Sequence, residues 1–108
     1  MNLLTAACTP NASALGPESI EAHLAQLPGW TLENGALVAR FRFDNFREVM
    51  DFATAVAEVA DGQDHHPEML LRYRDAELRF STHSAGNAVT MNDVICAAQV
   101  SHLPEATP

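Results

Sequence analysis

The sequence predicts an α+β fold with two layers, a four-stranded antiparallel sheet and three helices on one of its faces. Two pairs of segments alternate apolar and polar residues, and a short turn joins the members of each pair, which is typical of antiparallel hairpins. Three further segments place apolar residues three and four positions apart, as helices do. The resulting order is α-β-β-α-β-β-α, and 108 residues, 47% of them hydrophobic, suffice for one domain with one core.

The first helix follows an irregular start of the chain. Residues 1–16 are small and polar without a period, so we expect a flexible N-terminal tail before a single domain over residues 17–108. Pro17 suits the first position of a helix, which Pro28-Gly29 ends. The apolar residues of this helix are Ile20, Leu24 and Leu27.

A hairpin and the clearest helical stripe come next. Residues 30–33 and 36–43 are predicted as strands, and Asn34-Gly35 between them is a strong signal for a type I′ turn. Asp44 or Asn45 can cap the following helix, which Asp61-Gly62 is expected to end. The stripe of this helix consists of Phe46, Val49, Met50, Ala53, Val56, Ala57 and Ala60.

The last third of the chain repeats the pattern. Residues 68–73 and 76–82 are predicted as strands three and four around a tight turn at Asp75. After a loop of small residues, Thr90 caps a final helix that ends before Pro104. The apolar residues of this helix are Met91, Val94, Ile95 and Ala98.

Charge and composition exclude several classes of partner. The net charge is −8, and six Lys plus Arg cannot form the basic surface that nucleic acids or anionic membranes require. No apolar stretch approaches the roughly 20 residues of a membrane span, and the N-terminus lacks the basic region of a signal peptide. Cys8 and Cys96 lie far apart and outside any C-x-x-C, so we expect a reduced, soluble, cytoplasmic protein.

Three of the five histidines are predicted to meet at one edge of the sheet. His65 and His66 precede the third strand, and His83 follows the fourth. Because these strands are hairpin partners, the start of one and the end of the other share an edge. Adjacent histidines in an extended segment point to opposite sides, and Pro67 favours that extended form, so one His is expected to face the pocket and the other to reach it from the rim.

Other interpretations of these residues remain open. Three histidines and Asp61 could hold Zn²⁺ or Fe²⁺, although adjacent ligands suit a metal less well than ligands spaced by two or four. Trp30 is either a core residue or the wall of a ligand pocket, where it would stack on a flat ring. The remaining polar candidates are interpreted as solvated or ion-paired surface: His23, His102, Arg40, Arg42, Arg72 and Arg79.

The spacing of these residues resembles the signature of the pterin-4a-carbinolamine dehydratases. Asp61, three residues, His65-His66-Pro67, then Tyr73, His83 and Asp93 follow the order of that signature. The resemblance covers roughly residues 17–103 and includes Pro28-Gly29-Trp30, Phe41-Arg-Phe-Asp-Asn-Phe46 and Ser81-Thr82-His83. The chain departs from the animal enzymes in two places: Asp61 stands where they carry Glu, and the loop after His83 is one residue longer.

The resemblance implies a hydro-lyase without cofactor or metal. Its substrate would be the 4a-hydroxytetrahydrobiopterin that aromatic amino acid hydroxylases release, and its product quinonoid dihydropterin plus water, in tetrahydrobiopterin recycling. Loss of water needs an acid for the hydroxyl and a base for the ring N–H, and imidazole can be either at neutral pH. We assign catalysis to His65, His66, His83 and Asp61, and substrate binding to Trp30, Pro67, Thr82 and Ser84.

The resemblance also implies homodimers or homotetramers whose sheets pair between subunits. Some members of the family act as dimerisation cofactors of a transcription factor, and some related domains are inactive. The alternative function is therefore a non-catalytic dimerisation or assembly cofactor on the same fold.

Overall fold

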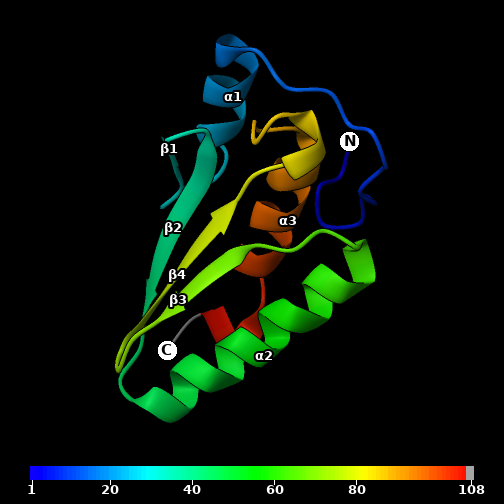
Figure 1. The fold of residues 1–108 in the computed structure, drawn as a ribbon. Coiled ribbons are helices and arrows are strands. Elements are labelled where there is room, and N and C mark those ends of the chain that lie inside the picture. The colour runs from blue at the N-terminus through cyan, green and yellow to red at the C-terminus, as the bar shows by residue number, and fades with distance from the viewer. Residues whose placement is uncertain (107–108) are drawn as a thin grey trace.

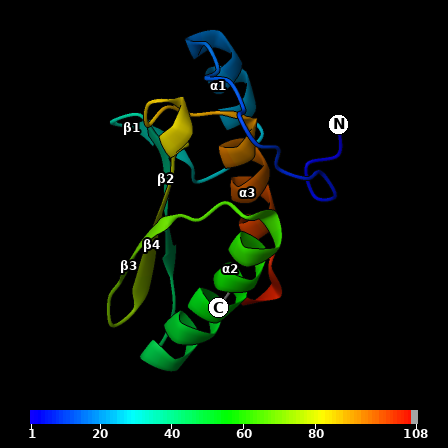
Figure 2. The ribbon, with the colours of Figure 1, turned by 45° about the vertical axis from the view of Figure 1, so that its right-hand side comes forward.

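The computed structural model describes residues 1–106, so residues 107 and 108 of the predicted domain lie outside the described residues. Figure 1 shows helices α2 and α3 packed on one face of the sheet, with α1 at its end on the same side, as Figure 2 also shows. The observed order confirms the predicted α-β-β-α-β-β-α fold. The elements are α1 (Pro17–Leu24), β1 (Thr31–Glu33), β2 (Ala36–Arg42), α2 (Phe46–Gln63), β3 (Glu68–Leu71), β4 (Asp75–Phe80) and α3 (Met91–Ser101).

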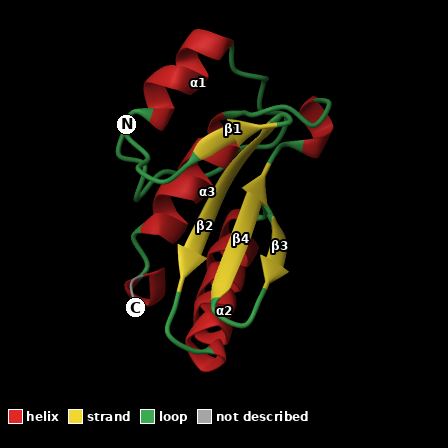
Figure 3. Ribbon diagram, turned by 90° about the vertical axis from the view of Figure 1, so that its left-hand side faces the viewer, coloured by secondary structure: helices red, strands yellow, loops and turns green. Residues whose placement is uncertain are grey.

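The four strands form one antiparallel sheet in the order β1-β2-β4-β3 (Figure 3). The first hairpin closes as predicted, because Asn34 and Gly35 both have positive φ, at 50° and 77°, as a type I′ turn requires. Glu33 pairs with Ala36 across this turn. The sheet leaves β3 as one edge strand, and its start and the end of β4 lie at the same edge of the pair.

The core lies between the sheet and helices α2 and α3. Alternate residues of β4 face it, and Leu78 and Phe80 are fully buried. On α2, Phe52 is also fully buried although it is absent from the predicted stripe, because it lies one turn from both Val49 and Val56 and completes their face. Three members of that stripe, Phe46, Met50 and Ala57, are instead exposed.

Helix α2 continues past the predicted stop at Asp61-Gly62 and ends after Gln63. Asp64 takes the left-handed conformation with φ 51°, its N–H binds the Asp61 carbonyl, and the His65 N–H binds the Ala60 carbonyl. This pair of hydrogen bonds is a Schellman closure. The Gln63 side chain also binds the N-terminal segment, so tertiary contacts support the last turn beyond Gly62. The closure fixes the direction in which the chain enters the histidine pair.

Residues 1–16 contain no helix or strand, but side-chain amides of α2 and α3 bind their backbone. Gln63 and Gln99 both donate to the Ala6 carbonyl at distances of 3.0 Å, and Asn92 binds Thr9. We predicted this segment to be a flexible tail, and in the structure these hydrogen bonds join its backbone to α2 and α3. In the part of the chain that the structure describes, no helix has the length and apolar character needed to cross a membrane.

Candidate active site

A polar pocket of about 470 Å³ lies at the end of the sheet where the β1–β2 turn, the start of β3 and the end of β4 meet. Figure 3 turns toward the viewer the face of the sheet that carries no helices. Arg79 and Ser81 alternate with the buried Leu78 and Phe80, so they lie on the face of the sheet opposite the core. His83 follows them in a short 3-10 turn, His83–Ala85. The lining residues are Asn34, Ala36, His66, Glu68, Arg79, Ser81, His83 and Asn87.

Two of the predicted histidines, His66 and His83, line this pocket together from separate loops. His66 Nε2 lies 2.9 Å from Asp61 Oδ1, so the shorter acidic side chain reaches the imidazole. His83 Nδ1 lies 3.0 Å from Asn87 Oδ1. Because both partner atoms are acceptors, each imidazole donates one N–H to a fixed oxygen and keeps its other ring nitrogen for a ligand.

His65 turns away from the pocket into the interior. Its Nε2 donates to Asp93 Oδ1 over 2.6 Å, and its ring lies nearly parallel to that of Phe80, with the centroids 6.1 Å apart. The His65 side chain is 12% exposed, against 57% for His66. The adjacent histidines therefore face opposite sides of the segment, and His65 is a structural anchor for the loop that presents His66.

The carboxylate of Asp93 connects His65 to the loop after His83. Its Oδ2 atom accepts hydrogen bonds from the Thr82 hydroxyl and the Thr90 N–H, each over 2.8 Å. The Thr90 hydroxyl then donates to Thr82 Oγ1 over 2.7 Å and accepts from the Asn92 N–H. All of these groups are buried and each has a partner, so the network holds both histidine-bearing loops against the start of α3.

The four predicted substrate-binding residues do not line this pocket. Trp30 is buried in the core, where its indole donates to Ser101 Oγ over 2.7 Å and packs against Phe41 and Phe80. Thr82 belongs to the buried Asp93 network. The other two, Pro67 and Ser84, lie in the histidine-bearing segments but outside the lining. In this chain the pocket is therefore walled by polar side chains rather than by an aromatic ring.

Sequence reasoning missed Arg79, which contributes a positive charge to the lining. It was interpreted as part of a solvated face, yet its Nη2 lies 3.4 Å from the Glu33 carbonyl and its Nε 3.6 Å from Glu68 Oε1. Alternation along β4 was the available signal, because Arg79 lies between the buried Leu78 and Phe80 and therefore on the opposite face of the strand. Asn34 and Asn87 carried no comparable signal, since only the folded turn brings them to the pocket.

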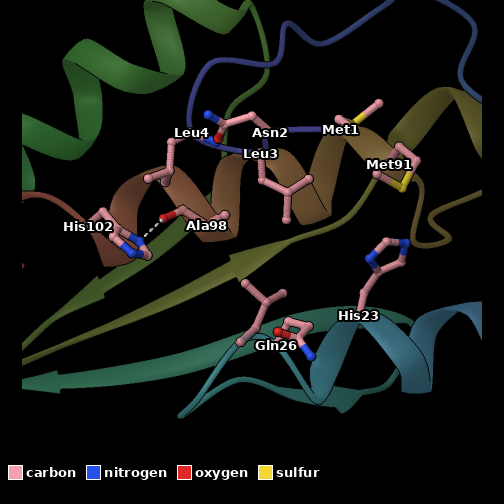
Figure 4. A pocket seen from close by; sticks show the side chains of 10 residues that line it. Met1, Asn2, Leu3, Leu4, His23, Gln26, Met91, Ala98 and His102 are labelled. Carbon is pink, nitrogen blue, oxygen red and sulfur yellow. Dashed lines mark hydrogen bonds between the residues drawn. The ribbon is translucent and has the colours of Figure 1, made fainter.

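A second pocket, of about 480 Å³, lies between residues 1–4, α1 and α3. Figure 4 shows His23 and His102 in its wall, with His102 Nδ1 donating to the Ala98 carbonyl over 3.0 Å. Its other side chains are mainly apolar, and no carboxylate lines it. Within residues 1–106, no group of three or more His, Cys, Asp or Glu side chains is arranged to hold a metal ion.

Comparison with known proteins finds a matching family model and several relatives of similar sequence. The family model described as pterin 4 alpha carbinolamine dehydratase matches residues 13–103. A provisionally named pterin-4-alpha-carbinolamine dehydratase of Chromobacterium violaceum is 42% identical over 105 residues, covering 95% of this chain and 96% of the relative. A relative with the same provisional name from Stenotrophomonas maltophilia is 41% identical over 111 residues, covering 98% and 95%.

Two solved structures share the fold. A transcriptional coactivator/pterin dehydratase from Brucella melitensis superposes with a TM-score of 0.78 at 28% identity, covering 82% of this chain and 96% of the other. A pterin dehydratase-like protein identified as a RuBisCO assembly factor in the alpha-carboxysome has a TM-score of 0.53 at 18% identity. It covers 66% of this chain and 81% of its own, and its likeness concerns the fold alone.

Proposed function

Because the chain belongs to the pterin-4a-carbinolamine dehydratase family, we propose that it is a hydro-lyase that removes water from a 4a-hydroxytetrahydropterin. The observation that carries the proposal is the placement of His66 and His83 in one pocket, each with one ring nitrogen free for a ligand. At about 470 Å³ the pocket falls within the 300–1,000 Å³ that is usual for small-molecule sites.

We propose different roles for the two imidazoles, on the basis of their hydrogen bonds. Neutral His83 carries its proton on Nδ1, bound to Asn87, so Nε2 has a free lone pair and can accept the proton of the pterin N5. Protonated His66 keeps Nε2–H on Asp61 and can donate its Nδ1 proton to the C4a hydroxyl. The hydroxyl leaves as water while the N5 electrons form the C4a=N5 bond, which gives the quinonoid dihydropterin. Solvent exchange then restores both rings.

The decisive experiment is a stopped-flow dehydration assay of a carbinolamine generated in situ. We expect His66→Ala and His83→Ala each to lower kcat by about 10²–10⁴-fold, the usual contribution of one general acid or base. His23→Ala is the matched control, because His23 lies in the other pocket and its loss leaves both imidazoles in place. A wild-type rate no higher than that of the His66→Ala, His83→Ala double variant would remove the enzymatic proposal.

That negative outcome would favour the alternative function, a non-catalytic dimerisation or assembly cofactor. The names of the two structural neighbours, a coactivator/dehydratase and an assembly factor, make this the relevant competitor. The paired imidazoles favour the enzyme, since a surface that only binds protein has no need for two rings with fixed partners around one pocket.

We also propose that the protein self-associates through β3. This edge strand exposes unpaired backbone groups together with Met69 and Leu70, which are 36% and 49% exposed, and a second copy of β3 would cover both. Leu70→Glu should then shift the mass in solution toward the monomer, measured by light scattering. An unchanged mass would place the interface elsewhere.

The physiological setting follows from the substrate. The carbinolamine would come from a hydroxylase that oxidises a tetrahydropterin, and the product would return to tetrahydrobiopterin recycling. We place this reaction in the cytoplasm.

A further inference from the structure

We propose that Cys8 and Cys96 form an intramolecular disulfide under oxidising conditions, and that this bond fastens the N-terminal segment, residues 1–16, to α3. The two thiols are free, and their Sγ atoms are 3.7 Å apart although 88 positions separate them in the chain. A disulfide requires an S–S distance near 2.04 Å, so the sulfurs need to approach by about 1.7 Å.

The approach is possible because only one of the two cysteines lies within a helix or strand. Cys96 is fully buried in the middle of α3, whereas Cys8 is partly exposed in a segment without helix or strand. A small shift of that segment toward α3 therefore closes the gap without moving the helix.

Hydrogen bonds on both sides of Cys8 aim its thiol at α3. The Cys8 N–H donates to Gln63 Oε1 over 2.8 Å. One residue later, the Asn92 amide binds Thr9 twice, accepting from its N–H over 3.0 Å and donating to its carbonyl over 2.8 Å. Amides of α2 and α3 thus hold the backbone next to Cys8, and the Cys8 thiol also lies 3.6 Å from the Asn92 carbonyl. This arrangement supplies the orientation that two cysteines so far apart in sequence need.

The oxidant we invoke is a low-molecular-weight disulfide such as glutathione disulfide. The partly exposed Cys8 loses its proton and attacks one sulfur of the oxidant, which gives a mixed disulfide and releases one thiol. Cys96 then loses its proton and attacks the Cys8 sulfur, which closes the Cys8–Cys96 bond and releases the second thiol. The two protein thiols give up two electrons and the oxidant gains them.

Burial of the two thiols makes this exchange slow. It raises the pKa of both thiols, so each stays protonated at neutral pH and attacks slowly. The bond therefore suits a response to sustained oxidation rather than a step in each catalytic turnover.

The bond would act on the supports of the active site rather than on its lining. Gln63, which binds Cys8, precedes His65 by two residues, and Asn92, which binds Thr9, precedes Asp93 directly. Neither cysteine lines the pocket of His66 and His83. We therefore expect the disulfide to stabilise the fold while the chemistry of the pocket continues.

The test incubates the full chain with glutathione disulfide and maps its peptides without reduction. We expect a linked pair of peptides containing Cys8 and Cys96, loss of both titratable thiols, and a rise in Tm of at least about 5 °C that dithiothreitol reverses, because the bond closes a long loop. Amide exchange of residues 1–16 should slow in the oxidised form.

Two single variants serve as controls. Cys8→Ser and Cys96→Ala each keep one thiol and should show no rise in Tm with the oxidant; Cys8→Ser replaces a partly exposed side chain and tests the proposal even if the core variant folds poorly. Persistent thiols, a stable glutathione adduct on Cys8, a disulfide between two chains, or a cystine that leaves Tm unchanged would each overturn the proposal.

Discussion

Asp93 is the residue on which the arrangement of the two histidine-bearing loops depends most directly. It is fully buried, and its carboxylate accepts three hydrogen bonds, from His65, Thr82 and the Thr90 N–H. The same side chain closes the capping box of α3 with Thr90. One carboxylate therefore binds the start of α3, the segment that follows β4 and the first residue of the histidine pair.

We predict that Asp93→Asn lowers the free energy of unfolding by about 1–3 kcal/mol, the cost of leaving a buried donor without an acceptor. An amide has the shape of the carboxylate but only one oxygen, so its NH₂ group must face either the His65 N–H or the Thr90 N–H. Urea denaturation followed by circular dichroism measures the loss.

Asp61→Asn provides the matched control for this prediction. It also replaces a carboxylate bound to an imidazole, but Asp61 is 79% exposed, and exposed ion pairs contribute about 0–1 kcal/mol. Its stability should stay close to that of the wild type while the dehydration rate falls. Equal destabilisation by the two variants would contradict the role assigned to the buried network.

For single residues, the sequence predicted that His66 and His83 lie near each other better than it predicted the direction of each side chain. The His65-His66-Pro67 pattern correctly indicated that the two rings face opposite sides, because extended backbone alternates its side chains. Which ring faces the pocket could not be predicted, since that depends on the position of Asp93 in the folded chain. For Trp30 both core and pocket wall were open, and the structure places it in the core, where its indole binds Ser101, 71 positions away.

At the scale of elements, the β1–β2 turn packs against the loop that follows His83. Gly35 has φ 77°, and a methyl group added to it would lie 2.9 Å from the Asn87 carbonyl oxygen. Asn34 and Asn87 line the pocket from the two sides of this contact. The close approach therefore determines the width of the pocket opposite His66.

Gly35→Ala is predicted to destabilise the protein, because the methyl group must push Asn87 away from the turn. Since Asn87 lines the pocket, the KM for the proposed pterin substrate should also rise. Gly29→Ala separates the cost of the backbone conformation from the cost of the clash, since Gly29 has a similar φ of 87° but no atom within 4 Å of the added methyl group. Both variants pay the left-handed backbone cost of about 1–2 kcal/mol, and only Gly35→Ala adds the clash. Denaturation and steady-state kinetics on both variants separate the effects, and a KM change shared by both would refute the contact.

Elements set by local chemistry were the ones that the sequence predicted well. The type I′ turn and the Thr90 cap depend on a few adjacent residues, and both are confirmed. The end predicted for α2, Asp61-Gly62, was one or two residues too early, because the bonds between Gln63 and the N-terminal segment are tertiary. The position of β4 between β2 and β3 follows from pairing of the two hairpins, which alternation alone does not specify.

For the whole molecule, the packing of the N-terminal segment against α3 couples stability to alkaline pH. Desolvation raises the pKa of Cys96 and of Cys8 above the ordinary value of 9.0. For Cys96, the contact with Cys8 and the charge of Asp93 raise the pKa by smaller amounts. For Cys8, the hydrogen bond with Cys96 lowers the pKa and Asp93 raises it, both less than burial does. A folded chain with raised thiol pKa values keeps those protons after the unfolded chain has begun to lose them. The resulting stability is complete below pH 9 and is lost as the pH rises further.

The reduced protein should therefore lose stability between pH 9 and pH 10.5, with a slope for Cys96 approaching about 1.4 kcal/mol per pH unit. Few other groups titrate in this pH range, because the chain contains no lysine and a single tyrosine, the exposed Tyr73. Urea midpoints measured across this range with a phosphine reductant test the slope, and Tyr73→Phe removes the background of that phenol. Cys96→Ala should reduce the slope to what Cys8 alone contributes; an unchanged slope in this variant would mean that a group other than Cys96 couples folding to alkaline pH.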